Sequence, residues 1–126
     1  MKRIWSLMMI GALLSLSCSL AHAHGSTKPM HGGVVQLVGE MSFELVANAK
    51  GAEVYLIDDG EDVATEGMTG KLTITAGGEK SEAALTPAGG NKLHAPGVKI
   101  PSGSKVTVLV TMKDQATKMR AIFTAP

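Results

Sequence analysis

The sequence predicts an all-β protein: a small antiparallel immunoglobulin-like β-sandwich of about seven to eight strands, preceded by a flexible N-terminal arm. Apolar and polar residues alternate in six separate runs, the pattern of strands that bury one face. Residues typical of turns separate these runs. No window of ten or more residues after position 23 shows clear helical spacing. A small closed barrel is the alternative architecture that fits the same pattern.

The expected strands follow one another along the chain, each with apolar residues at alternate positions. The alternating runs lie at 41–47, 52–57, 71–76, 80–85, 105–112 and 118–123. The segment Ala76-Gly77-Gly78-Glu79 is typical of a tight hairpin between two of them. On the run at 41–47, Glu44 falls on the polar face, opposite Phe43 and Leu45. Eight apolar residues on the inward faces are predicted to form the core: Val54, Leu56, Leu72, Ile74, Val106, Val108, Val110 and Phe123.

Residues 1–23 are predicted to be a cleaved export signal rather than part of the fold. Lys2 and Arg3 give the segment a positive start, and residues 4–20 form an uncharged apolar run. An Ala-His-Ala sequence at 21–23 then supplies the small-x-small pattern of a cleavage site, although cleavage after Ala21 is an alternative. We therefore expect the protein to be exported to the periplasm.

Two other roles for this segment are less consistent with its residues. A membrane anchor is disfavoured because the apolar run is short and rich in serine. Lipidation at Cys18 is disfavoured because the leucine expected three residues earlier is a serine, Ser15. The rest of the chain is predicted to comprise a flexible arm, residues 24–32, and a β-sandwich domain, residues 33–126.

Composition excludes several classes of function for residues 24–126. Their net charge is −1, which gives no sign of a nucleic-acid-binding surface. They contain no cysteine, so disulfides, thiolate metal sites and a cysteine nucleophile are excluded. The acidic stretch at 58–62 lacks the ligand spacing of a calcium loop and is predicted to be a solvated turn. No nucleophile elbow or phosphate-binding glycine loop occurs, and we expect a protein that is not an enzyme.

Histidine is the residue type that points most directly to function. Cleavage after Ala23 would make His24 the first residue, and its α-amine and imidazole can chelate one ion. Cleavage after Ala21 would place His24 at position three, where the amine, two backbone amides and the imidazole form a square-planar nitrogen site. Both donor sets favour copper(II), with nickel or zinc as alternatives. The competing interpretation is that these histidines belong only to a cleavage sequence.

Further candidate ligands lie downstream of this terminus. Met30 and His31 place a soft thioether beside an imidazole, a combination suited to copper(I). His94 shares the polar face of its run with Lys92, so we expect it to be exposed and to join the site only if its strand lies beside the arm. The competing interpretation is that His31 and His94 are ordinary surface residues. The predicted metal ligands are therefore His24, His31 and His94, with Met30 as a soft auxiliary and copper as the favoured ion.

Four segments of the chain form a recurring pattern: His31-Gly32-Gly33-Val34-Val35, Phe43-Glu44-Leu45-Val46, Ala76-Gly77-Gly78-Glu79-Lys80 and the stretch from Leu85 to Leu93. This pattern resembles small exported bacterial β-domains associated with copper and cobalt–zinc–cadmium efflux systems, and is similar to N-terminal modules of periplasmic efflux adaptors. The resemblance implies a periplasmic location, handling of a transition metal, and an efflux adaptor as candidate partner. Of the motif residues, it carries over only His31 as a ligand. The chain lacks the helical hairpin and lipoyl-like halves of an adaptor, so it would act as a free domain.

These observations lead to two functional expectations. The first is a periplasmic transition-metal-binding protein that acts as a buffer or shuttle in metal resistance or efflux. The alternative is a non-enzymatic interaction module that docks to an envelope or efflux protein without binding metal. A copper enzyme that oxidises polysaccharides is disfavoured because residues 24–126 contain only three aromatic residues, Phe43, Tyr55 and Phe123, too few for a flat sugar-binding surface.

Overall fold

A computed structural model describes residues 27–126 of the chain, and in this range every regular element is a β-strand. The nine strands are β1 (Val34–Val38), β2 (Met41–Asn48), β3 (Gly51–Asp58), β4 (Glu61–Asp62), β5 (Thr69–Ala76), β6 (Glu79–Pro87), β7 (Lys92–Pro96), β8 (Lys105–Thr111) and β9 (Lys118–Thr124). All their pairings are antiparallel, which confirms the predicted all-β class. Among residues 27–126 no helix is long and apolar enough to cross a membrane. The predicted signal peptide, residues 1–23, lies outside the described residues.

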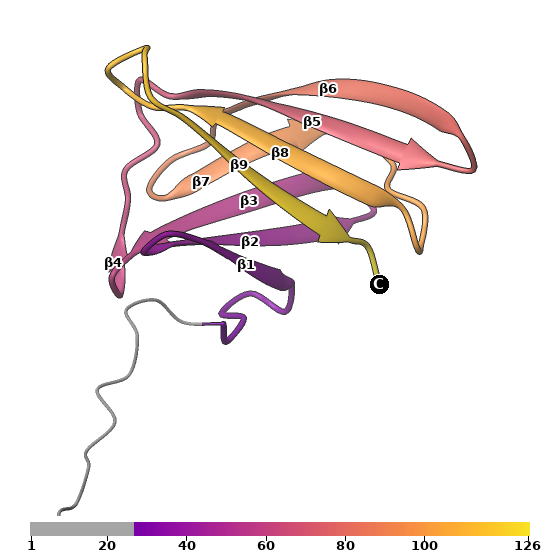
Figure 1. The fold of residues 1–126 in the computed structure, drawn as a ribbon, viewed down its shortest axis with the longest axis horizontal. Helices are drawn as coiled ribbons and strands as arrows, with labels where there is room; N and C mark the ends of the chain where they lie inside the picture. Colours follow the sequence, from indigo (N-terminus) through magenta and orange to yellow (C-terminus); the bar gives the residue numbers. More distant parts are fainter. Residues whose placement is uncertain (1–26) are drawn as a thin grey trace, which may run out of the picture.

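The strands form one continuous sheet that bends back on itself into two layers (Figure 1). Their order is β1-β2-β3-β7-β6-β5-β8-β9, and the short β4 pairs with β3. Strand β6 connects the layers, because its residues 79–85 pair with β5 while Thr86 and Pro87 pair with β7. At the other side β1 lies next to β9, so the sheet is nearly closed. The arrangement is therefore barrel-like, closer to the closed-barrel alternative than to an immunoglobulin-like sandwich.

The core lies between the two layers and contains the residues that alternation assigned to it. All eight predicted core residues are at most 3% exposed. Phe43, Leu85 and Leu93 complete the set of large, fully buried apolar side chains around them. Alternation therefore identified the inward faces correctly, because residues two apart on a strand point to the same side.

The predicted hairpin turn is also present. Strands β5 and β6 pair up to Ala76 and Glu79, which leaves Gly77 and Gly78 as the two turn residues. Both glycines have positive φ, 58° and 83°, as a two-residue turn of this kind requires. The glycines in this motif are thus explained by the backbone alone.

Strand β2 departs from the expected pattern. Alternation assigned Ser42 and Glu44 to a polar face, yet all five residues from Met41 to Leu45 are buried. Three of these five residues, Met41, Phe43 and Leu45, belong to the core, as alternation predicted. The outer face is covered by a segment that precedes β1 in the chain, and this cover forms the candidate site.

Candidate functional site

The site is built around the carboxylate of Glu44, which is 4% exposed on the outer face of β2. Three backbone N–H groups donate to it: those of Met30 at 3.0 Å, His31 at 2.8 Å and Gly33 at 2.9 Å. Successive amides that converge on one anion form a compact anion-binding concavity. Here the anion belongs to the protein itself, so Glu44 fixes the segment before β1 onto the sheet.

The imidazole of His31 is held in place from two sides. Its Nδ1 lies 2.9 Å from Oε1 of Glu44, and its ring stacks on that of Tyr55 with centroids 3.6 Å apart and an angle of 6° between the planes. Because an ionised carboxylate only accepts hydrogen bonds, Nδ1 carries the hydrogen. In the neutral ring the lone pair then resides on Nε2, the nitrogen through which an imidazole can bind a metal ion.

The hydrogen bonds keep Glu44 ionised despite its burial. Burial alone raises the pKa of this carboxyl group. The hydrogen bond from the His31 side chain, together with those from the backbone N–H groups of Gly33, Met30 and His31, outweighs burial and lowers the pKa below its ordinary value of 4.5. Glu44 is therefore a carboxylate at neutral pH and a strong acceptor for the His31 ring.

The two glycines after His31 explain why the segment can approach β2 so closely. Gly32 has a φ of +75°, a region that residues with a side chain rarely adopt. A Cβ atom on Gly33 would lie only 2.3 Å from the carbonyl oxygen of Leu45. The His-Gly-Gly sequence thus has a definite local role, because it presents the imidazole while the backbone packs against β2.

Tyr55 connects the His31 ring to a second pair of side chains on the same face. Its hydroxyl group donates a hydrogen bond of 2.6 Å to Glu53, and this bond is the main reason that the pKa of Tyr55 is raised to about 12. Glu53 lies directly opposite His94 in the pairing of β3 with β7, so the two side chains leave the same face of the sheet. His94 is half-buried, whereas the sequence led us to expect an exposed residue.

The predicted ligands are brought together only in part. Met30 and His31 both bind Glu44 through their backbone, and the Met30 residue is 66% exposed. A hollow of about 200 Å³ beside them is lined in part by Met30 and Tyr55. His94 lies on β7, near Glu53, and His24 is outside the described residues. Within residues 27–126 there is no group of three or more His, Cys, Asp or Glu side chains that could hold a metal ion.

Sequence reasoning missed Glu44 and Tyr55 as parts of the site. Glu44 was assigned to a solvated strand face, and Tyr55 was noted only as one of few aromatic residues. No local signal distinguished Glu44, because a glutamate between Phe43 and Leu45 is also what an alternating strand with a solvated polar face shows. The chain by itself gave no indication that the partner precedes β1.

Comparison with known proteins adds nothing to this geometry, because no protein-family profile, curated protein or solved structure matches the chain.

Proposed function

We propose that the chain is a periplasmic transition-metal-binding protein, with copper favoured and nickel or zinc as alternatives, that acts as a non-enzymatic buffer or shuttle in metal resistance or efflux. One observation carries the proposal: Glu44 binds Nδ1 of His31 and leaves Nε2 as the donor atom. Imidazoles that ligate metals usually give their other ring N–H to a carboxylate or carbonyl group in this way, which fixes the ring and raises its basicity.

Three further side chains are candidate donors to the same ion. Met30 directly precedes His31 and is largely exposed, so its thioether is one candidate. His24 lies seven residues before His31, and an extended chain of that length reaches about 23 Å, enough to bring its imidazole and a free amine to the ring. His94 lies on the same sheet face, opposite Glu53, and we expect it to contribute less to binding than His31 does. Nitrogen and thioether donors suit copper in either oxidation state.

The surroundings favour a site that exchanges its ion over one that seals it in. The His31 side chain is 38% exposed, and the core between the layers is complete without any ion. A structural metal would be needed for folding, whereas this core already buries its large apolar side chains. We therefore expect the protein to fold in the absence of metal and to release the ion to a partner, with an efflux adaptor as the candidate.

The single tyrosine supplies a direct assay. Tyr55 is the only tyrosine, and the processed chain has no tryptophan because Trp5 belongs to the predicted signal. A copper(II) ion on Nε2 of His31 would lie close to the stacked Tyr55 ring and quench its fluorescence. We expect quenching that is complete near one equivalent of copper(II) in the processed chain. His31→Ala should abolish it, and Glu44→Gln should weaken binding by about tenfold or more.

His94→Ala is the matched control, because it removes an imidazole from the same sheet face but leaves the contact between His31 and Glu44 in place. It should retain most of the binding. Calorimetric titration with copper(I), nickel(II) and zinc(II) identifies the preferred ion. If the folded, processed chain binds none of these ions more tightly than millimolar, the metal proposal is wrong and the interaction module takes its place. If His31→Ala binds as well as the parent, the ion is held elsewhere and the assignment of His31 as a ligand is wrong.

The location of the protein is tested separately. We expect the chain in the periplasmic fraction, and its intact mass should place the first residue at His24 or at His22. Recovery of an unprocessed chain from the cytoplasm would contradict export. Metal binding should also weaken as the solution is made acidic, because protons compete with the metal ion for the ligand nitrogens.

A further inference from the structure

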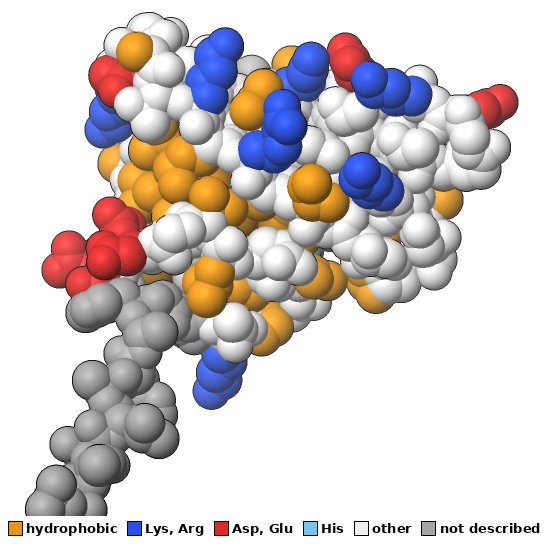
Figure 2. Space-filling model, viewed as in Figure 1, with side chains coloured by type: hydrophobic (Ala, Val, Ile, Leu, Met, Phe, Trp, Pro, Cys, Tyr) orange, Lys and Arg blue, Asp and Glu red, His pale blue; other side chains and the backbone are white. Residues whose placement is uncertain are grey.

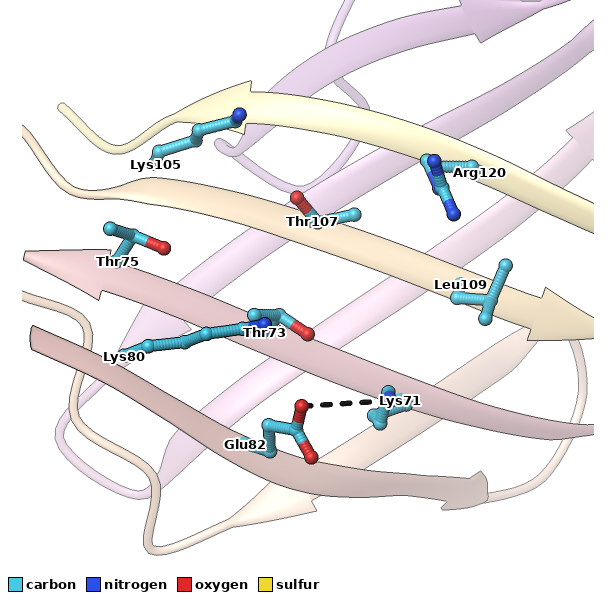
Figure 3. A pocket seen from close by; sticks show the side chains of 9 residues that line it. All are labelled: Lys71, Thr73, Thr75, Lys80, Glu82, Lys105, Thr107, Leu109 and Arg120. Atoms are coloured by element: carbon cyan, nitrogen blue, oxygen red, sulfur yellow. Dashed lines mark ion pairs between the residues drawn. The ribbon is translucent and has the colours of Figure 1, made fainter.

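The outer face of the other layer carries a second hollow, of about 410 Å³, that plays no part in the metal proposal. It lies over β5, β6, β8 and β9, where Figure 2 shows several lysine and arginine side chains along the upper part of the molecule. Figure 3 shows the side chains that line it: four cationic side chains, three threonines, Leu109 and Glu82. The cations of this basic hollow are Lys71, Lys80, Lys105 and Arg120.

Strand register places these residues in a grid. The central row contains Glu82, Thr73 and Thr107 on neighbouring strands. The row on one side contains Lys80, Thr75 and Lys105. The row on the other side contains Lys71, Leu109 and Arg120. Two threonine hydroxyl groups therefore occupy the centre, with pairs of cations in the rows on either side (Figure 3).

The spacing of the cations sets the size of a matching ligand. Lys80 and Lys105 are two strands apart, as are Lys71 and Arg120. With neighbouring strands about 4.8 Å apart, the backbones of each pair are about 10 Å apart. The two pairs are separated by four residues along the strands, or about 13 Å. A ligand with several anionic groups matches this spread of cations better than a single small anion, which would require all four side chains to converge on one point.

The chemistry of the basic hollow is that of a hydrogen-bond donor surface. Ammonium and guanidinium groups only donate, and threonine hydroxyl groups can donate as well. Strands β5 and β8 are each paired on both sides, so their backbones offer no free edge to a peptide strand. The lining includes no aromatic side chain on which a base or sugar ring could stack. The carboxylate of Glu82 repels anions, and its Oε1 forms an ion pair of 3.6 Å with Nζ of Lys71.

We propose that the basic hollow binds a ligand that carries two or more phosphoryl groups. Phosphate oxygens accept hydrogen bonds from lysine, arginine and threonine, and several phosphoryl groups match cations spread over 10–13 Å. The ligand is either a soluble polyphosphate or a surface of phosphorylated lipid headgroups, which share this chemistry. The inference is independent of metal binding at His31.

The experiment uses two probes with the processed chain. The first probe is sodium tripolyphosphate, and its binding is measured by calorimetry. The second is phosphatidylglycerol vesicles, and binding to them is measured by co-sedimentation. Phosphatidylcholine vesicles are the neutral reference. We expect binding that weakens as salt is added. The double variant Lys80→Glu/Lys105→Glu should lose at least about tenfold in affinity, because it replaces two charge-assisted contacts with repulsion. Binding to tripolyphosphate indicates a soluble ligand, and binding to phosphatidylglycerol vesicles alone indicates a lipid source.

Two variants separate specific binding from general attraction. Lys99→Glu changes an exposed lysine outside the basic hollow and should leave affinity nearly unchanged. Glu82→Gln should bind a few-fold more tightly, because it removes the one carboxylate from the lining. All these side chains are exposed, so unchanged circular dichroism spectra are expected. Failure of both probes to bind, or an equal loss of affinity in Lys99→Glu, would overturn the proposal.

Discussion

The outer faces of the two layers begin from the same strand pattern and end in different environments. On β2 the outward Glu44 lies under the segment that carries Met30 and His31, and its carboxylate is almost fully buried. On β6 the outward Glu82 is 52% exposed and contacts one lysine. The same residue type therefore organises a covered site in one layer and modifies an open charged surface in the other. Alternation alone does not distinguish these two situations.

The largest difference between the two faces is expected in stability. Glu44→Ala should lower the free energy of unfolding by about 3 kcal/mol, because four hydrogen-bond donors lose a charged acceptor. The loss is not larger because release of the segment lets some of these donors bind water instead. Glu82→Ala should change it by less than about 0.5 kcal/mol, as exposed ion pairs contribute little. Urea unfolding followed by circular dichroism measures both values. Equal effects would show that Glu44 does not anchor the segment.

The next prediction concerns the close approach of the segment to β2. Gly33→Ala should destabilise the fold by about 2 kcal/mol, because the new methyl group would meet the Leu45 carbonyl oxygen and force the backbone to shift. The same change should move the His31 ring off Tyr55 and reduce copper quenching of its fluorescence. Thermal unfolding and the copper titration are the two measurements. Parent-like stability would mean that the segment packs less closely than described.

The strands and core were predictable from sequence, and the covered site was not. Period-two alternation depends on local geometry, so it assigned Leu72, Ile74 and Val108 to the interior correctly. Burial of Glu44 depends on a contact with residues 11–14 positions earlier in the chain, which no local pattern encodes. Near closure of the sheet likewise depends on β6 pairing with both β5 and β7.

A smaller effect is expected in the response of stability to acid. The folded-state pKa of Glu44 lies below its ordinary value of 4.5, so the carboxylate stabilises the fold above that value. This stabilisation is lost as the pH falls through the lowered pKa, when the folded state must take up a proton. Unfolding measured between neutral pH and pH 3 should show a steeper loss in the parent than in Glu44→Gln. Parallel curves for the two chains would contradict this assignment.

The smallest effect concerns Tyr55, and it can be measured without interference because no other tyrosine is present. Its phenol should ionise near pH 12 in a rapid absorbance titration, mainly because its hydroxyl group donates to Glu53. Glu53→Gln should bring the midpoint closer to the ordinary value of 10. The raised pKa stabilises the fold below pH 10, and this contribution is lost as the pH rises through about 12. An ordinary midpoint in the parent would show that the Tyr55–Glu53 bond is absent in solution.

The central claim is that Glu44 fixes the ring of His31 and that Nε2 of this ring is the metal donor. A long-range ¹H–¹⁵N NMR spectrum of the histidine side chains tests it most directly. We predict that at mildly alkaline pH the apo protein shows the Nδ1–H tautomer for His31, and that one equivalent of zinc(II) shifts the Nε2 resonance of this ring. A spectrum with the Nε2–H tautomer for His31, or a His31 ring unaffected by zinc(II), copper(I) and nickel(II) alike, would contradict it.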